Sequence, residues 1–300
     1  MKKIAFVTLF PEWIRESLSH SMMARAEASG SVEFSVVNPR SYCYDSHRKV
    51  DDIPYGGHPG MLMKAEPVAL AIESLVEMIQ PPPSRDKVTA SHLPLLGEGL
   101  VRDNLGSDHL ITSGKVRSDF EVESKVTLPD GGVGKRGTSE PVGVDSHKTA
   151  IVITEPSGTK FEQPQAEELA SYDQIIFVCG HYEGIDHRIE ETFATHVFSI
   201  GDYVLTNGEL PALVMTDAVV RLLPGVLGNQ DSLAEESFQN DLLGAPNYTR
   251  PDIWREKSIP DVLKSGNHAQ IDRWRSEQAR ERTRRFRPDL LDKKGGYKGN

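Results

Sequence analysis

The sequence lacks the features that mark several large classes of protein. It has two cysteines, Cys43 and Cys179, which are too few for a disulfide framework or a cysteine zinc site and indicate a reducing, cytoplasmic compartment. No apolar run reaches the roughly 18 residues that a membrane-spanning helix needs, so no membrane association is expected.

Common active-site motifs are missing as well. No G-x-G-x-x-G follows the first apolar segment and no P-loop motif occurs, so dinucleotide and P-loop sites are not supported. There is no G-x-S-x-G motif of the kind that positions a hydrolase serine. The ten histidines are scattered without metal-ligand spacing, and no metal site is predicted from the pattern.

Basic charge is scarce. The formal net charge is −10, which argues against a broad nucleic-acid surface, and DNA is not an expected partner. Two segments are basic although the whole chain is acidic. They are the cluster His47-Arg48-Lys49, and residues 273–287, which hold seven arginines against two glutamates. The simplest interpretation of the second segment is a solvated helix face with internal ion pairs.

Apolar segments of strand and helix type alternate along most of the chain. This order predicts an α/β domain with a mostly parallel sheet. The expected strands are 3–10, 32–37, 150–154, 174–179 and 197–200, and the expected helices are 11–30, 66–79, 163–170, 185–194 and 209–223, with a helical C-terminal segment over 259–286.

Composition divides the chain into three parts. Residues 1–225 form the α/β domain, 226–250 an interdomain linker, and 251–300 a small helical domain. Residues 81–148 open with three prolines, are rich in glycine and charge, and hold one aromatic residue, Phe120. They are predicted to be a flexible insertion with a short hairpin over 116–128, because they offer little to pack.

Glycine-containing turns follow three of the expected strands, at 155–158, 180–184 and 200–208. Ligands of open α/β sheets bind at the carboxyl ends of the strands, and glycine lets a ligand approach the backbone closely. The three turns suit an adenine or ribose held by backbone groups. Tight turns without a ligand are the equally simple alternative.

Seven ordered motifs resemble those of bacterial tRNA (guanine-37-N1)-methyltransferases, the TrmD family of the SPOUT superfamily. The resemblance covers about residues 1–79 and 150–290. The motifs are Leu9-Phe10-Pro11-Glu12, Asp51-Asp52-Ile53-Pro54-Tyr55-Gly56-Gly57, Gly180-His181-Tyr182-Glu183-Gly184-Ile185-Asp186, Ile200-Gly201-Asp202-Tyr203-Val204-Leu205-Thr206, Pro224-Gly225-Val226-Leu227-Gly228, Asn247-Tyr248-Thr249-Arg250-Pro251 and Leu263-Lys264-Ser265-Gly266-Asn267-His268.

The resemblance implies a fold and a set of partners that composition does not show. It implies a trefoil knot within 150–225, a homodimer, S-adenosylmethionine as the methyl donor, and a tRNA whose guanosine 37 lies between the subunits. Magnesium is often associated with activity in this family, although the sequence offers no ligand constellation for it.

The resemblance also assigns residues. The donor pocket would be lined by Ile153, Thr154, Pro156, Gly180, Tyr182, Glu183, Gly184, Ile200, Gly201, Tyr203, Leu205, Gly208 and Pro211. The RNA would meet His47, Arg48, Asp51, Tyr55, Arg250, Ser265, Asn267 and His268. For the last four, capping and anchoring of the linker are equally good interpretations.

Two residues are carried over as the catalytic pair. Guanine N1 is protonated, so methylation needs a general base and a cation or hydrogen-bond donor at O6. Arg221 matches the family's arginine, and Glu236 stands where the family has an aspartate followed by Ser-Phe. Glu235 and Asp231 are alternative bases. Asn207 is a further departure, at a position where the family usually has glycine.

Three functions stay open at this point. The first is methylation of guanosine 37. The second is a catalytically weakened or inactive tRNA-binding relative, favoured by the longer reach of Glu236 and by the insertion. The third is a related methyltransferase with altered RNA choice, against which the intact segments 47–60 and 247–268 argue.

Overall fold

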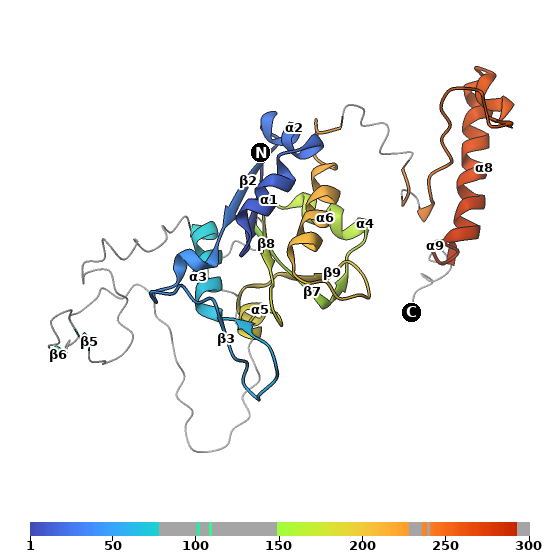
Figure 1. Ribbon diagram of the computed structural model, residues 1–300. Helices are drawn as coiled ribbons and strands as arrows, with labels where there is room; N and C mark the ends of the chain where they lie inside the picture. The colour runs from blue at the N-terminus through green and yellow to red at the C-terminus, as the bar shows by residue number, and fades with distance from the viewer. Residues whose placement is uncertain (78–100, 103–107, 110–148, 228–235, 239–240, 293–300) are drawn as a thin grey trace, which may run out of the picture.

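A five-stranded parallel sheet forms the centre of the N-terminal part. The computed structural model describes residues 1–77, 101–102, 108–109, 149–227, 236–238 and 241–292 (Figure 1). The strand order is β2-β1-β8-β7-β9. The bounds are β1 (Lys2–Val7), β2 (Val32–Val37), β7 (Thr149–Lys160), β8 (Gln174–Cys179) and β9 (His196–Ser199), and each pair of neighbours is parallel.

Helices cover both faces of this sheet. Ile4 and Phe6 of β1 point to one face, where they share a core with α1 (Pro11–Leu18), α2 (Ser21–Ala28), α4 (Gln163–Ser171) and α6 (Glu209–Val220). Ala5 and Val7 point to the other face, toward α3 (Ala65–Glu77) and α5 (His187–Phe193). Burial on both faces explains why the strands are continuous apolar runs. The expected α/β class with a parallel sheet is confirmed.

The expected helix over 11–30 is wrong in one respect, because it is two helices. Ser19 ends α1 by donating its backbone N–H to Arg15 and its hydroxyl to the carbonyl of Glu16. Ser21 then has a positive φ of 51°. The Ser-His-Ser sequence between the two apolar segments offers these local hydrogen bonds in place of a continuous helix.

Other boundaries shift by a few residues. β7 continues past 154 to Lys160 with a register shift between Thr154 and Thr159. The expected helix over 185–194 starts only at His187, because the side chain of Asp186 caps it by accepting from the N–H of Arg188. The segment 38–63 holds a 3₁₀-helix, η1 (Pro39–Tyr42), and a two-stranded ladder of β3 (Asp51–Asp52) and β4 (Leu62–Met63).

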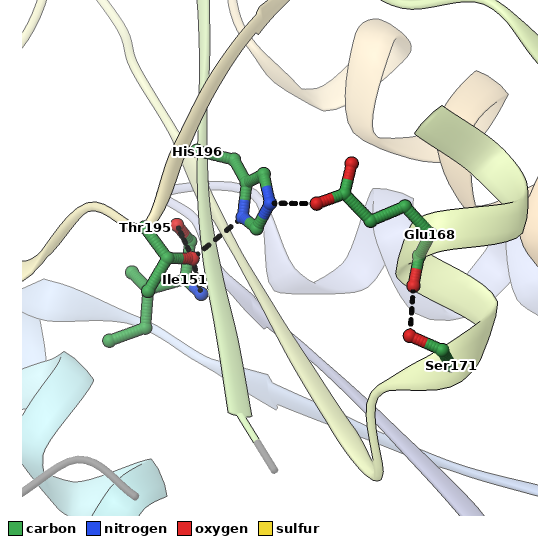
Figure 2. Close-up of polar contacts among 5 residues, drawn as sticks. All are labelled: Ile151, Glu168, Ser171, Thr195 and His196. Carbon is green, nitrogen blue, oxygen red and sulfur yellow. Dashed lines mark hydrogen bonds and ion pairs between the residues drawn. The ribbon is translucent and has the colours of Figure 1, made fainter. Parts of the chain in front are cut away.

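A hydrogen-bonded chain of side chains fixes the edge strand β9 to the sheet (Figure 2). Thr195 Oγ1 lies 2.9 Å from the N of Ile151, 3.1 Å from its carbonyl oxygen, and 2.7 Å from Nδ1 of His196. The other ring nitrogen of His196 lies 3.2 Å from a carboxylate oxygen of Glu168 on α4. These contacts hold the start of a four-residue strand whose far end reaches the site described below.

The C-terminal part is mostly helical over 259–286, as expected, but a hairpin that the sequence did not predict precedes the helices. It begins with a hairpin of β10 (Ile253–Trp254) and β11 (Lys257–Ser258), followed by η5 (Asp261–Lys264) and the helix α8 (His268–Phe286), with the short α9 (Asp289–Asp292) after it. The side chain of Asn267 caps α8 by accepting from the N–H of Gln270, which sets its start. In Figure 1, α8 lies apart from the central sheet.

The insertion falls mostly outside the described residues. Within 81–148 the structure gives one short antiparallel ladder, β5 (Val101–Arg102) with β6 (Asp108–His109). The hairpin expected over 116–128 lies outside the described part. Residues 228–235 and 239–240 of the expected linker also lie outside it. Within the described residues, no helix has the length and apolar character needed to cross a membrane.

Candidate functional site: a glycine-lined cavity and an arginine–glutamate pair

A cavity of about 210 Å³ lies where the chain leaves β8 and β9, beside the first turn of α6. β7 contributes residues at its register shift, so three neighbouring strands meet there. The lining residues are Thr154, Glu155, Pro156, Gly180, His181, Tyr182, Glu183, Gly184, Phe198, Ser199, Ile200, Gly201, Tyr203, Val204, Leu205, Thr206, Asn207, Gly208 and Pro211.

The sequence-based donor site and this cavity overlap closely. Every residue expected to line a donor pocket lines the cavity except Ile153, which is 4% exposed and packs in the core on the α3 side of the sheet. Sequence reasoning did not assign His181 to the site, although it lies inside a quoted motif, and it noted Asn207 only as a departure from the family. It also missed Phe198 and Ser199, since the last residues of an apolar strand give no signal of a site.

The loop 180–184 is held from outside the sheet by the chain near β4. The N–H of Glu183 donates to the carbonyl of Met61 over 3.0 Å, and the N–H of Met63 donates to the carbonyl of Gly184 over 3.0 Å. Tyr182 has φ 61° and Gly184 φ 122°, so the loop turns sharply between these bonds. Residues 61–63 therefore support the floor of the cavity although they do not line it.

Gly208 brings the loop before α6 against the end of β8. Its N–H donates to the carbonyl of Gly180 over 2.8 Å, and Thr154 Oγ1 donates to its carbonyl over 3.2 Å. A Cβ at this position would collide with Thr154 Oγ1 and would lie 2.8 Å from the N of Gly180. This approach requires glycine, because backbone atoms cannot move aside as a flexible side chain can.

Beneath the cavity, the carboxyl of Glu209 is buried. The residue is 0% exposed, and one oxygen accepts a hydrogen bond of 2.5 Å from Thr8 Oγ1. The other oxygen has no hydrogen-bond partner within the described residues. Burial raises the pKa of Glu209 above its usual value, and the Thr8 hydrogen bond opposes that rise. Burial, with Glu209 nearby, also raises the pKa of the Cys179 thiol well above its usual value.

Two residues of the cavity lining contain buried polar atoms. His181 Nδ1 and Asn207 Oδ1 are buried and find no hydrogen-bond partner in the part of the chain that the structure describes. An unpaired buried polar atom is costly, so a ligand that pairs with such atoms gains affinity. The His181 ring packs edge-on against Phe10, with the centroids 5.1 Å apart, which limits its movement.

Arg221 and Glu236 form a bidentate ion pair at the other end of α6. Nη1 lies 2.6 Å from Oε2 and Nη2 lies 2.6 Å from Oε1, with side chains about one third exposed. The hydrogen bonds that Arg221 donates to Glu236 raise the pKa of Arg221 above its usual value. The sequence placed these two residues in one site, and the structure brings them together. Glu235 and Asp231, the alternative bases, lie outside the described residues.

The ion pair and the cavity are separated by the length of a helix. Gly208 and Pro211 line the cavity at the start of α6, and Arg221 follows its last residue, Val220. Twelve helical residues span roughly 18 Å, at about 1.5 Å per residue. Within this chain the ion pair therefore lies about a helix length from the cavity.

The residues expected to meet RNA lie on several separate surfaces. Tyr55 is fully exposed, and Asp51 lies half-buried in β3. His47 and Arg48 belong to an exposed turn whose amides bond to Asp45. In the C-terminal part Arg250 is exposed before Pro251, and His268 is exposed as the first residue of α8.

The two remaining residues of that set have local structural roles. The Asn267 side chain caps α8, and the Ser265 hydroxyl accepts from the N–H of Asn267 while donating to the carbonyl of Val262. Across the described ranges, no three histidine, cysteine or acidic side chains form a cluster that could hold a metal ion.

Together, the fold and the cavity define an α/β protein with a ligand site at the carboxyl edge of a parallel sheet, an arrangement common among enzymes that bind nucleotide cofactors. A family model described as "tRNA (Guanine-1)-methyltransferase TrmD" matches residues 1–91 and 135–293. The chain belongs to this family.

Curated relatives align over nearly the whole chain. The tRNA (guanine-N(1)-)-methyltransferase of Moorella thermoacetica is 39% identical over 289 residues, which cover 96% of this chain and 90% of that protein. The protein of the same name from Staphylococcus aureus strain JH9 is 38% identical over 291 residues, covering 97% and 91% of the two chains.

The substitution Gly208→Ala tests the close approach between the α6 loop and β8. We expect it to destabilise the fold by about 1–3 kcal/mol and to weaken ligand binding in the cavity, because backbone atoms must separate to admit the methyl group. Chemical denaturation and calorimetric titration with S-adenosylhomocysteine measure the two effects. The control is Gly180→Ala, whose Cβ would meet nothing closer than 3.5 Å. Equal stability of the two variants would contradict the argument.

The substitution Glu209→Gln tests the buried carboxyl. An acid whose native pKa is raised keeps its proton to higher pH in the folded state than in the unfolded state, so its effect on stability becomes less favourable as pH rises. The free energy of unfolding of Glu209→Gln should therefore gain on that of wild type as pH rises from the usual glutamate range to above the raised pKa, measured by urea denaturation at several pH values. Glu33→Gln, exposed on β2, is the control. A pH-independent difference for Glu209→Gln would refute the pKa direction.

Proposed function

We propose that this protein transfers the methyl group of S-adenosylmethionine to N1 of guanosine 37 in tRNA. Membership of the family and the names of the relatives support an enzyme that methylates tRNA guanine at N1. Two features of the structure support the reaction: a cavity whose lining suits the methyl donor, and the Arg221–Glu236 pair, which suits guanine. The position within the tRNA follows from the motifs around 47–60 and 247–268.

The cavity residues fit the methyl donor. The backbone at Gly180 and Gly184 is open to a flat ring, Leu205 and Ile200 give apolar walls, and Glu183 offers a carboxylate for hydroxyl or ammonium groups. His181 and Asn207 add two polar side chains to the same lining. When bound, S-adenosylmethionine supplies an electrophilic methyl group on a sulfonium.

The ion pair matches the edge of guanine that reacts. Guanine presents the N1–H donor beside the O6 acceptor, and a glutamate beside an arginine presents an acceptor beside a donor. Glu236 would accept the N1 proton, and Arg221 would donate to O6, where negative charge develops as N1 attacks. Arg221 has five N–H donors, so it can bond O6 and still hold Glu236 in place. This pair, with both N–O distances at 2.6 Å, is the observation that carries the proposal.

The distance along α6 favours a site shared between two subunits. Leu210 and Val214, four residues apart on one face of α6, are 44% and 50% exposed and apolar. In a two-fold dimer whose axis is perpendicular to α6, helices packed on this face run antiparallel, which puts the Arg221 end of one beside the cavity end of the other. A homodimer thus brings the base of one subunit to the donor of its partner.

The arginines of α8 suit a phosphate backbone. Arg273, Arg280 and Arg284 are spaced seven and four residues apart, so they share one face, and all three are exposed. The buried Thr283 lies on another face, where its hydroxyl accepts from the N–H of Leu243. We infer that the arginine face meets the tRNA. The trefoil knot, the cytoplasmic location and a magnesium requirement are further parts of the proposal that rest on the family resemblance.

A methylation assay tests the reaction and the base. With S-adenosylmethionine and magnesium, a tRNA transcript carrying guanosine 37 should yield 1-methylguanosine by nucleoside mass spectrometry, and the adenosine 37 transcript should not. Glu236→Gln should lower kcat by about 10²–10⁴-fold, because a glutamine cannot take the proton. Binding of S-adenosylhomocysteine should be unchanged, and Glu236→Asp should keep most of the activity.

The matched control is Glu235→Gln. Loss at position 235 with full activity at 236 would move the base to the neighbouring residue. No product from wild type, with donor and tRNA both bound, would favour the inactive tRNA-binding alternative.

Mixing two inactive variants tests the shared site. Glu183→Ala impairs the donor cavity and Glu236→Gln the base. After subunit exchange at equal amounts, half of the dimers are mixed and each has one intact site if the site spans two subunits, so about a quarter of wild-type activity should return. If each subunit holds a complete site, the mixture should stay inactive.

A further inference from the structure

The β10–β11 hairpin exposes a tryptophan beside two cations. Trp254 is 57% exposed, and its partner across the antiparallel ladder is Lys257. Side chains paired across a ladder lie on the same face, so the lysine flanks the indole. The guanidinium carbon of Arg255 lies over the indole, 4.9 Å from the ring centroid. The tryptophan is therefore ordered by a cation on one side and still leaves more than half of its surface to solvent.

The turn of this hairpin holds large charged residues in an unfavourable conformation. Arg255 and Glu256 have φ values of 46° and 66°. Two-residue hairpin turns with positive φ at both positions favour Asn-Gly, because side chains with a Cβ are strained there. A strained position that keeps a large charged side chain is a candidate for function. Here the strain places the arginine over the indole.

An arginine also lies over an exposed aromatic ring at the end of α8. Arg285 lies over Phe286, at 4.9 Å, and Phe286 is 58% exposed. Exposed aromatic rings interleaved with arginine are the usual means of gripping unpaired nucleotides, because every base has a face that stacks and the cation meets the adjoining phosphate. A protein partner is less suited, since this two-stranded ladder offers a small surface with charged residues around one indole.

We propose that Trp254 stacks on an unpaired base of the tRNA, with Arg255 holding the indole and Lys257 meeting the neighbouring phosphate. This inference rests on the proposed function, since it takes the tRNA as substrate. It assigns the hairpin a binding role separate from the acid–base pair. Trp254 is a binding residue here, so its loss should raise KM for tRNA and leave kcat at saturating tRNA unchanged.

Kinetics of matched variants test the stacking. Trp254→Ala should raise KM for tRNA about tenfold, within the range for loss of one base–aromatic stack, and Trp254→Phe should restore most of the affinity. Trp13→Ala, which removes a 37% exposed tryptophan from α1, should leave KM unchanged. An unchanged KM in Trp254→Ala, while wild type methylates guanosine, would overturn the inference and leave the proposed function standing.

Fluorescence of Trp254 distinguishes base stacking from a purely structural role, because only stacking on RNA would quench the emission. The chain has three tryptophans, so Trp13→Phe with Trp274→Phe leaves Trp254 as the single emitter. An anticodon stem–loop RNA should quench its emission, and a fully paired duplex of the same length should quench little. Equal quenching by both RNAs, or a change of Trp254→Ala from dimer to monomer in light scattering, would overturn the proposal. The fluorescence assay measures RNA binding at Trp254 whether or not methylation is detected.

Discussion

The approach of Gly208 to the end of β8 is the contact on which the site depends. One hydrogen bond of 2.8 Å joins its N–H to Gly180, and no side chain separates the two backbones. This contact fixes where α6 begins. It thereby places Pro211 in the cavity wall, Glu209 beneath it, and Arg221 a full helix length away. The cavity and the ion pair are thus positioned by the same helix, from its opposite ends.

The cavity and the ion pair, separated by the length of α6, also differ in their surroundings. The cavity is lined largely by backbone, glycine and apolar side chains, which suits recognition of a cofactor by shape and hydrogen bonding. The charged pair lies partly exposed outside the sheet, where a large substrate can reach it. The C-terminal part adds arginines and exposed aromatic rings on elements with their own small hydrogen-bonded framework. In the reaction we propose, donor binding, proton removal and RNA binding would therefore use different parts of the chain.

Sequence reasoning succeeded where the physical signal is local. The five strands are short apolar runs, and burial on both faces makes such runs easy to recognise. Sequence reasoning failed where a few hydrogen bonds determine the residue at which a helix starts or ends. The break between α1 and α2 depends on Ser19, and the start of α8 depends on the Asn267 cap. The hairpin before η5 was missed, because its turn has Arg-Glu in place of the residues that usually mark one.

The sequence by itself determined the class of fold, the family and, through the motifs, twelve of the nineteen residues that line the cavity. It could do so because apolar periodicity and glycine-rich turns are written into short stretches of chain. Only the tertiary structure decided that Ile153 lies in the core and that His181 and Asn207, both in the cavity lining, have buried polar atoms without partners among the described residues. It also decided that Arg221 meets Glu236 far from the cavity end of α6. Such facts depend on distances between segments remote in sequence, which no local pattern encodes.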